Sequence, residues 1–144
     1  LDEQALSLAS ENIVLHERSD RVIALRADLL SALRSGSIDL VFANPPYVSR
    51  AQMAELPPEY TAEPRIALEA DAEGTELAVR LLREGARVLA PDGLMLLEVG
   101  ETWMTLEDRL PKVPFLWIEL PQGGSGVAVI SAQELRDWDA AGIL

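Results

Sequence analysis

The sequence feature that most constrains the fold is an apolar run that ends in two adjacent prolines. Residues 38–43, Ile-Asp-Leu-Val-Phe-Ala, have the near-continuous apolar character of a strand covered on both faces, as parallel strands in α/β domains are. Asn44 follows, and then Pro45 and Pro46, which lack backbone N–H groups and end the sheet ladder. We therefore expect a buried strand at 38–43 that leads into a rigid polar site.

The residues after this strand suit a planar amide or amino group. In open α/β sheets, ligands bind in the crevice outside the carboxyl ends of the strands, where Asn44 and Tyr47 would lie. The Asn44 carboxamide offers a carbonyl acceptor and an NH2 donor group, and Tyr47 adds a flat ring and a hydroxyl. The alternative is an ordinary strand-ending turn, because Asn and Pro are common in such turns.

Composition limits the class of protein. The 144 residues are 49% apolar, which is enough for one domain with its own core. With 12 basic and 24 acidic residues, the net charge is -12, which disfavours free nucleic acid as a partner and favours a basic one. Cysteine is absent and His16 stands alone, so we expect no disulfide and no metal site. No run is long enough to span a membrane and no signal peptide opens the chain, so we expect a cytoplasmic protein.

The order of the expected elements is that of an α/β domain. Asp2 would cap a first helix that ends at Leu15. Asp28 would either cap a helical segment at 29–34 or bind a ligand in the crevice, and the sequence leaves both open. We expect further helices at 73–89, 103–110 and 132–140, and strands at 22–27, 38–43, 94–99, 114–120 and 127–131.

Two connections between these elements are informative. The segment from Tyr47 to about Ala72 is long and irregular, as functional lids and binding loops often are. The glycine-rich segment 122–126 lacks the spacing of a phosphate loop and joins two strands, so it predicts an antiparallel hairpin.

The tetrapeptide Asn44–Tyr47 resembles the signature of S-adenosylmethionine-dependent methyltransferases that act on planar nitrogens in adenine, guanine or glutamine. The segments that narrow this resemblance are Glu59-Tyr60, Glu63-Pro64, Glu98–Gly100, 113–115 and 123–127. They look like the protein-glutamine N5-methyltransferases, and the tail resembles the branch that modifies a large-subunit ribosomal protein, protein L three. The resemblance implies the carboxyl-terminal part of a seven-stranded Rossmann-like sheet with a terminal antiparallel hairpin, in one partial catalytic domain over 1–144.

This resemblance also implies roles for individual residues. Asn44 would be the catalytic residue, accepting and orienting the substrate glutamine amide beside the methyl donor. Pro45, Pro46 and Tyr47 would form the wall against which that amide packs. Asp28 and Leu29 fall where the family holds the adenine of S-adenosylmethionine, and Asn44 also lies near that cofactor. The implied partner is a ribosomal protein, with no metal, no membrane and no nucleic acid beyond the ribosome.

The chain departs from the family pattern at its front. The family's glycine-rich loop, the acidic residue that holds the ribose and the amino-terminal helical domain should all lie ahead of Leu1. We therefore expect a fragment whose Ile38 strand exposes an apolar edge that favours a homodimer. Two other functions stay open: a nucleic-acid adenine or guanine amino-methyltransferase, and a non-catalytic half-fold that dimerises without binding cofactor.

Overall fold

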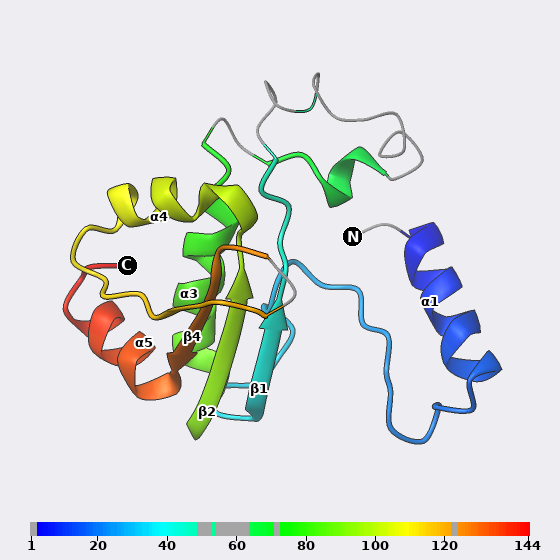
Figure 1. Ribbon diagram of the computed structural model, residues 1–144. Coiled ribbons are helices and arrows are strands. Elements are labelled where there is room, and N and C mark those ends of the chain that lie inside the picture. The colour runs from blue at the N-terminus through cyan, green and yellow to red at the C-terminus, as the bar shows by residue number, and fades with distance from the viewer. Residues whose placement is uncertain (1–2, 49–52, 54–63, 71–72, 122–123) are drawn as a thin grey trace. The chain divides into compact units, whose positions relative to one another are not determined.

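The computed structural model describes residues 3–48, 53, 64–70, 73–121 and 124–144 (Figure 1). The chain divides into two compact units, residues 1–32 and residues 33–144. The second unit contains both a sheet and helices, which confirms the predicted α/β class.

The first unit contains one helix and an extended segment. Helix α1 spans Glu3–Leu15, close to the predicted bounds, and none of its residues is buried. The predicted strand at 22–27 is wrong: this segment has no regular structure, and its Ile23 side chain is 87% exposed. A strand needs a neighbouring backbone to complete its hydrogen bonds, and no described strand pairs with this segment. Arg26 instead forms an ion pair with Glu3.

The helical segment predicted at 29–34 is also wrong, because the chain forms turns there. The backbone N–H of Ser31 donates to the carbonyl oxygen of Asp28 at 3.1 Å, which closes a single turn. Leu29 has a φ of +48°, in the left-handed region that interrupts a right-handed helix. Asp28 therefore has no helix to cap.

The second unit is built on a mixed sheet. Its described strands are β1 (Ile38–Ala43), β2 (Leu89–Glu98), β3 (Trp117–Ile118) and β4 (Val127–Ser131), in the order β1-β2-β4-β3. Strands β1 and β2 are parallel and their arrowheads point the same way in Figure 1, whereas β4 is antiparallel to both β2 and β3. Within the described residues the sheet has four strands, and β1 lies at its edge as expected. That these strands are part of a seven-stranded sheet stays a prediction.

Two helices cover one face of this sheet. Helix α3 spans Glu76–Val88 and α5 spans Ala132–Ala140, and both pack against β2 (Figure 1). A Cβ added at Gly85 of α3 would lie 2.5 Å from Cε of Met95 and 3.0 Å from Cδ1 of Leu135. The helices therefore meet the strand closely at this glycine. A capping box formed by Ser131 and Glu134 starts α5.

The opposite face of the sheet is exposed, which corrects the prediction that the 38–43 strand is buried on both faces. Val41 is 7% exposed on the covered face, whereas its neighbour Phe42 is 73% exposed. Leu40 and Leu94 are register partners on the open face and are also exposed. Side chains alternate between the faces of a strand, and described helices pack on only one of them.

The chain around Pro91-Asp92-Gly93 differs from the predicted helix end followed by a loop. Strand β2 already begins at Leu89, and the register shifts from Ile38 opposite Leu89 to Leu40 opposite Leu94. The extra residues of β2 form a bulge, which accommodates a proline within a strand.

The predicted strand at 114–120 is shorter than expected, since only Trp117–Ile118 pair with β4. Phe115 instead stacks on Trp117, with ring centroids 5.0 Å apart. Strands β3 and β4 pair antiparallel, and residues 122–123 between them lie outside the described residues, so the terminal hairpin stays a prediction. The remaining elements are α4 (Trp103–Arg109) and two 3-10 turns, η2 (Arg65–Ala67) and η3 (Gly100–Thr102).

Candidate active site

Asn44 lies at the carboxyl edge of the sheet, directly after β1. Ala43 is the register partner of Leu97 on the parallel strand β2, so both strands deliver their following residues to the same edge. Asn44 is exposed, whereas Pro45 is buried and Pro46 and Tyr47 are half-buried. A polar carboxamide is thus presented to solvent from a segment whose next residue is fixed in the fold.

The Tyr47 ring is seated against the backbone of Gly100, which follows β2. A Cβ added at Gly100 would lie 2.7 Å from both Cε2 and Cζ of Tyr47 and 3.0 Å from its hydroxyl oxygen. Gly100 also has a backbone φ of +51°, which residues other than glycine rarely adopt. Gly100 is therefore required twice, by its own conformation and by the aromatic ring that lies on it.

Two further glycines hold the segments around Tyr47. A Cβ at Gly74 would lie 2.4 Å from the carbonyl oxygen of Tyr47, and Gly74 has a φ of +75°. A Cβ at Gly126 would lie 2.2 Å from the carbonyl oxygen of Gly100. The backbone N–H of Val99 donates to the carbonyl oxygen of Gly126 at 2.8 Å. Gly74 thus approaches the backbone of Tyr47, and Gly126 approaches Gly100, on which the Tyr47 ring lies.

This glycine cradle of Gly74, Gly100 and Gly126 is only partly visible in the sequence. Gly100 and Gly126 fall within segments that carry the family resemblance, although nothing in their spacing assigned them to Tyr47. Gly74 gave a weaker signal as a lone glycine just before Thr75, the first residue before α3. Only the contacts across the fold link these positions to the site.

Only part of the segment 47–72, which was predicted to be a lid or binding loop, lies among the described residues. Glu59, Tyr60, Glu63 and most of the segment 49–63 lie outside the described residues. In the described part, Val48 pairs in parallel with Glu69, and its N–H donates to the carbonyl oxygen of Leu68 at 3.0 Å. The residue after Tyr47 is therefore tied to the far end of the same connection.

The predicted adenine-binding residues belong to the first unit. Asp28 is exposed and Leu29 is half-buried, and both lie within residues 1–32, whereas Asn44 lies in the second unit. Their approach to Asn44 stays a prediction. No group of three or more His, Asp or Glu side chains suited to a metal ion occurs among the described residues. In the same part of the chain, no helix combines the length and apolar content needed to cross a membrane.

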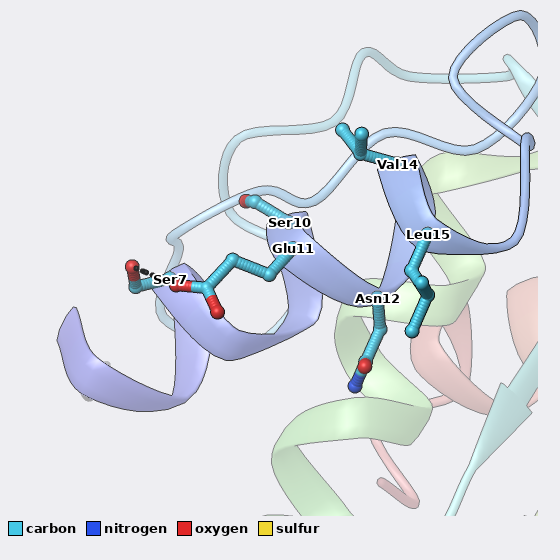
Figure 2. A pocket seen from close by; sticks show the side chains of 6 residues that line it. All are labelled: Ser7, Ser10, Glu11, Asn12, Val14 and Leu15. Atoms are coloured by element: carbon cyan, nitrogen blue, oxygen red, sulfur yellow. Dashed lines mark hydrogen bonds between the residues drawn. The ribbon is translucent and has the colours of Figure 1, made fainter.

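A surface hollow on α1 belongs to the first unit. Its lining residues, labelled in Figure 2, all come from this one helix and are all exposed. The Ser7 hydroxyl donates to Oε1 of Glu11 at 3.4 Å. Val14 and Leu15 project from different sides of the helix (Figure 2), so these side chains do not converge on a ligand.

Comparison with known proteins gives two relatives of the same name. A ribosomal protein uL3 glutamine methyltransferase of Francisella tularensis is 37% identical over 141 residues, covering 98% of this chain and 45% of that protein. A protein of the same name from Xanthomonas campestris is 38% identical over 136 residues, covering 94% of this chain and 44% of that protein. No protein-family model matches the chain.

The chain thus spans less than half the length of the curated relatives that it matches. Both relatives carry the name of the branch that the sequence motifs indicated, so the predicted resemblance is confirmed.

Proposed function

We propose that this chain carries the amide-binding site of a protein-glutamine N5-methyltransferase that acts on ribosomal protein uL3 in the cytoplasm. The observation that carries the proposal is the exposed Asn44 carboxamide, three residues before the seated Tyr47 ring, at the edge of the sheet where α/β domains bind ligands. The names of the two relatives support the substrate class.

Asn44 would hold the substrate amide by its polar edge. The Asn44 carbonyl oxygen can accept a hydrogen bond from the NH2 group of glutamine. An amide nitrogen is a poor nucleophile because its lone pair is delocalised into the carbonyl, and a hydrogen bond accepted from its N–H partly offsets this. The contribution of Asn44 is then orientation and polarisation of the amide.

Pro45, Pro46 and Tyr47 would form the wall of the amide site. Pro45 is buried, which fixes the backbone on the carboxyl side of Asn44. The Tyr47 ring packs against Gly100, so one face of the planar amide would pack against a rigid aromatic surface. A rigid wall keeps the amide nitrogen in one position relative to the methyl donor.

S-adenosylmethionine is the methyl donor that this reaction class implies, and when bound it supplies an electrophilic methyl group. The exposed carboxamide of Asn44 fits a place beside such a donor, since it can bind a polar group without first losing a buried contact. We assign the adenine to Asp28 and Leu29 on the basis of the family resemblance alone.

The proposal is tested by transfer of the labelled methyl group of S-adenosylmethionine to ribosomal protein uL3. The enzyme would be a chimaera in which this chain replaces the matching part of the Francisella relative. We expect mass spectrometry to find one methyl group on a glutamine side chain, and Asn44→Ala to lower kcat about 100-fold or more. Asp39→Asn, on the exposed part of β1, serves as the control and should leave kcat unchanged.

Label in ribosomal RNA instead of protein would favour the nucleic-acid alternative and reject this proposal. The net charge of -12 argues against that alternative, because a polyanion would be repelled.

A second candidate, the non-catalytic half-fold that dimerises, is favoured by the exposed edge strand. Strand β1 lies at the end of the sheet, and Leu40 and Phe42 on its open face are exposed. An unpaired apolar edge promotes pairing with a second copy. This candidate predicts a homodimer of the 144-residue chain with no affinity for S-adenosylmethionine, which sedimentation and calorimetric titration would test.

A further inference from the structure

We propose that an aromatic pocket next to Tyr47 binds an arginine or lysine side chain of the protein substrate, near the glutamine that is methylated. This inference rests on the proposed function, which it extends by a substrate subsite. The pocket has a volume of about 470 Å³, and its lining includes Trp103, Trp117, Glu119 and Gly126.

The pocket adjoins the amide site through two glycines. Gly126 lines the pocket, and a Cβ on it would lie 2.2 Å from the carbonyl oxygen of Gly100. Gly100 in turn lies under the Tyr47 ring. Trp103, which follows directly after η3 (Gly100–Thr102), is another lining residue. We therefore expect that a polypeptide with its glutamine at Asn44 would bring a neighbouring residue to this pocket.

The aromatic part of the pocket presents two indole rings at an angle. The ring centroids of Trp103 and Trp117 are 5.8 Å apart, with an interplanar angle of 62°. The Trp117 Nε1–H donates to Oε1 of Glu107 at 2.8 Å. Donation to a carboxylate increases the electron density of the indole, which strengthens its attraction for a cation.

One carboxylate lines the pocket and a second is hydrogen-bonded to another of its lining residues. Glu119 lines the pocket, and the Ser125 hydroxyl, also in the lining, donates to Oε1 of Glu101 at 3.3 Å. Among the described residues that line the pocket there is no lysine or arginine. Arg109 at the end of α4 is engaged with Glu76 and with the Thr75 hydroxyl. Phe115 stacks on one face of Trp117, so the pair offers a cation its remaining open indole face. A flat guanidinium or an ammonium group suits such a face next to a carboxylate, whereas an acidic side chain would be repelled.

The occupancy test uses two short peptides that differ only in charge. The probes are acetyl-Gly-Arg-Gly-amide and the same peptide with neutral citrulline, titrated into the 144-residue chain. The readout is the indole N–H signal of each tryptophan in heteronuclear NMR spectra, with the mostly buried Trp138 of α5 as internal reference. We expect saturable shifts at Trp103 and Trp117, with the citrulline peptide binding about 10-fold more weakly.

Matched variants attribute this binding to the pocket. Glu119→Gln should lower the affinity for the arginine peptide about 5-fold and leave the affinity for the citrulline peptide unchanged. Asp92→Asn, in the bulge at the opposite end of β2, is the control and should change neither affinity. Equal binding of the two peptides would reassign the pocket to neutral side chains, and absence of shifts at Trp103 and Trp117 would reject the subsite.

The subsite and the proposed function can fail separately. In the methyl-transfer assay, Glu119→Gln should raise KM for uL3 about 5-fold with kcat unchanged, because the contact is equal in ground and transition states. Arginine binding without methyl transfer would reject the function and keep a cation site. Methyl transfer without arginine binding would keep the function and reject the subsite.

Discussion

The two faces of the sheet in the second unit contain similar apolar side chains but differ in how far these are buried. On the face that carries α3 and α5, Met95 and Leu97 of β2 are 0% exposed. On the other face, Leu94 of the same strand is 40% exposed and Phe42 of β1 is 73% exposed. An apolar strand therefore does not by itself indicate which of its faces a given chain covers.

The difference in burial between the two faces also separates the residues that stabilise the fold from the residues that a partner could contact. The covered face is closed by helices whose own packing is tight, as the approach of Gly85 to Met95 illustrates. The open face ends in an edge strand and has no described helix against it. We therefore expect stability to depend on the first face and association on the second.

The largest effect should come from truncating a side chain on the covered face. Leu97→Ala should lower the free energy of unfolding by about 2–5 kcal/mol, because it removes a fully buried side chain and leaves a cavity. Leu94→Ala, the matched change on the open face, should cost below about 1 kcal/mol. Urea unfolding followed by circular dichroism measures both. Equal losses would mean that the open face is covered in solution.

Much of the second unit could be predicted because its signals are local. The strands at 38–43 and 127–131 and the helix at 132–140 were predicted with their observed bounds. Their ends coincide with prolines or a capping residue, which act on adjacent residues whatever the rest of the fold does. The helix predicted at 73–89 is present as α3, with somewhat shorter bounds.

The predictions that failed depended on partners distant in sequence. The segment 22–27 has the composition of a strand, but a strand forms only where another backbone is present to pair with it. Burial of both faces of β1 would require helices on both sides of the sheet. The apolar pattern of the strand does not indicate whether the second layer of helices is present. Glycine contacts such as that of Gly100 with Tyr47 bring together residues far apart in the chain, so the sequence predicted Tyr47 but not what holds it.

A substitution at Gly100, with an intermediate expected effect on stability, tests whether the candidate site is packed as closely as the covered face of the sheet. Gly100→Ala should lower the free energy of unfolding by about 1–3 kcal/mol, since it combines backbone strain with a clash against the Tyr47 ring. Gly36→Ala is a matched control because Gly36 has a φ of +62° and no atom within 4 Å of its added Cβ. The difference between the two variants isolates the contact with Tyr47.

A double-mutant cycle with Tyr47→Ser then checks this assignment. Removing the ring should reduce the cost of Gly100→Ala to that of Gly36→Ala, so that the two changes at the site are not additive. Additive losses would show that the Tyr47 ring does not rest on Gly100 in solution.

The smallest effect on stability, and the most informative about partners, is expected for Phe42→Ser on the open face. An exposed side chain contributes little to folding, so unfolding at low protein concentration should change by less than about 0.5 kcal/mol. Val41→Ala, one residue away on the covered face, should cost more because Val41 is buried. A cost above about 1 kcal/mol for Phe42→Ser would mean that another surface covers Phe42 in solution. If that surface belongs to a second copy of the chain, the stabilisation grows with protein concentration, whereas stabilisation from within the same chain does not.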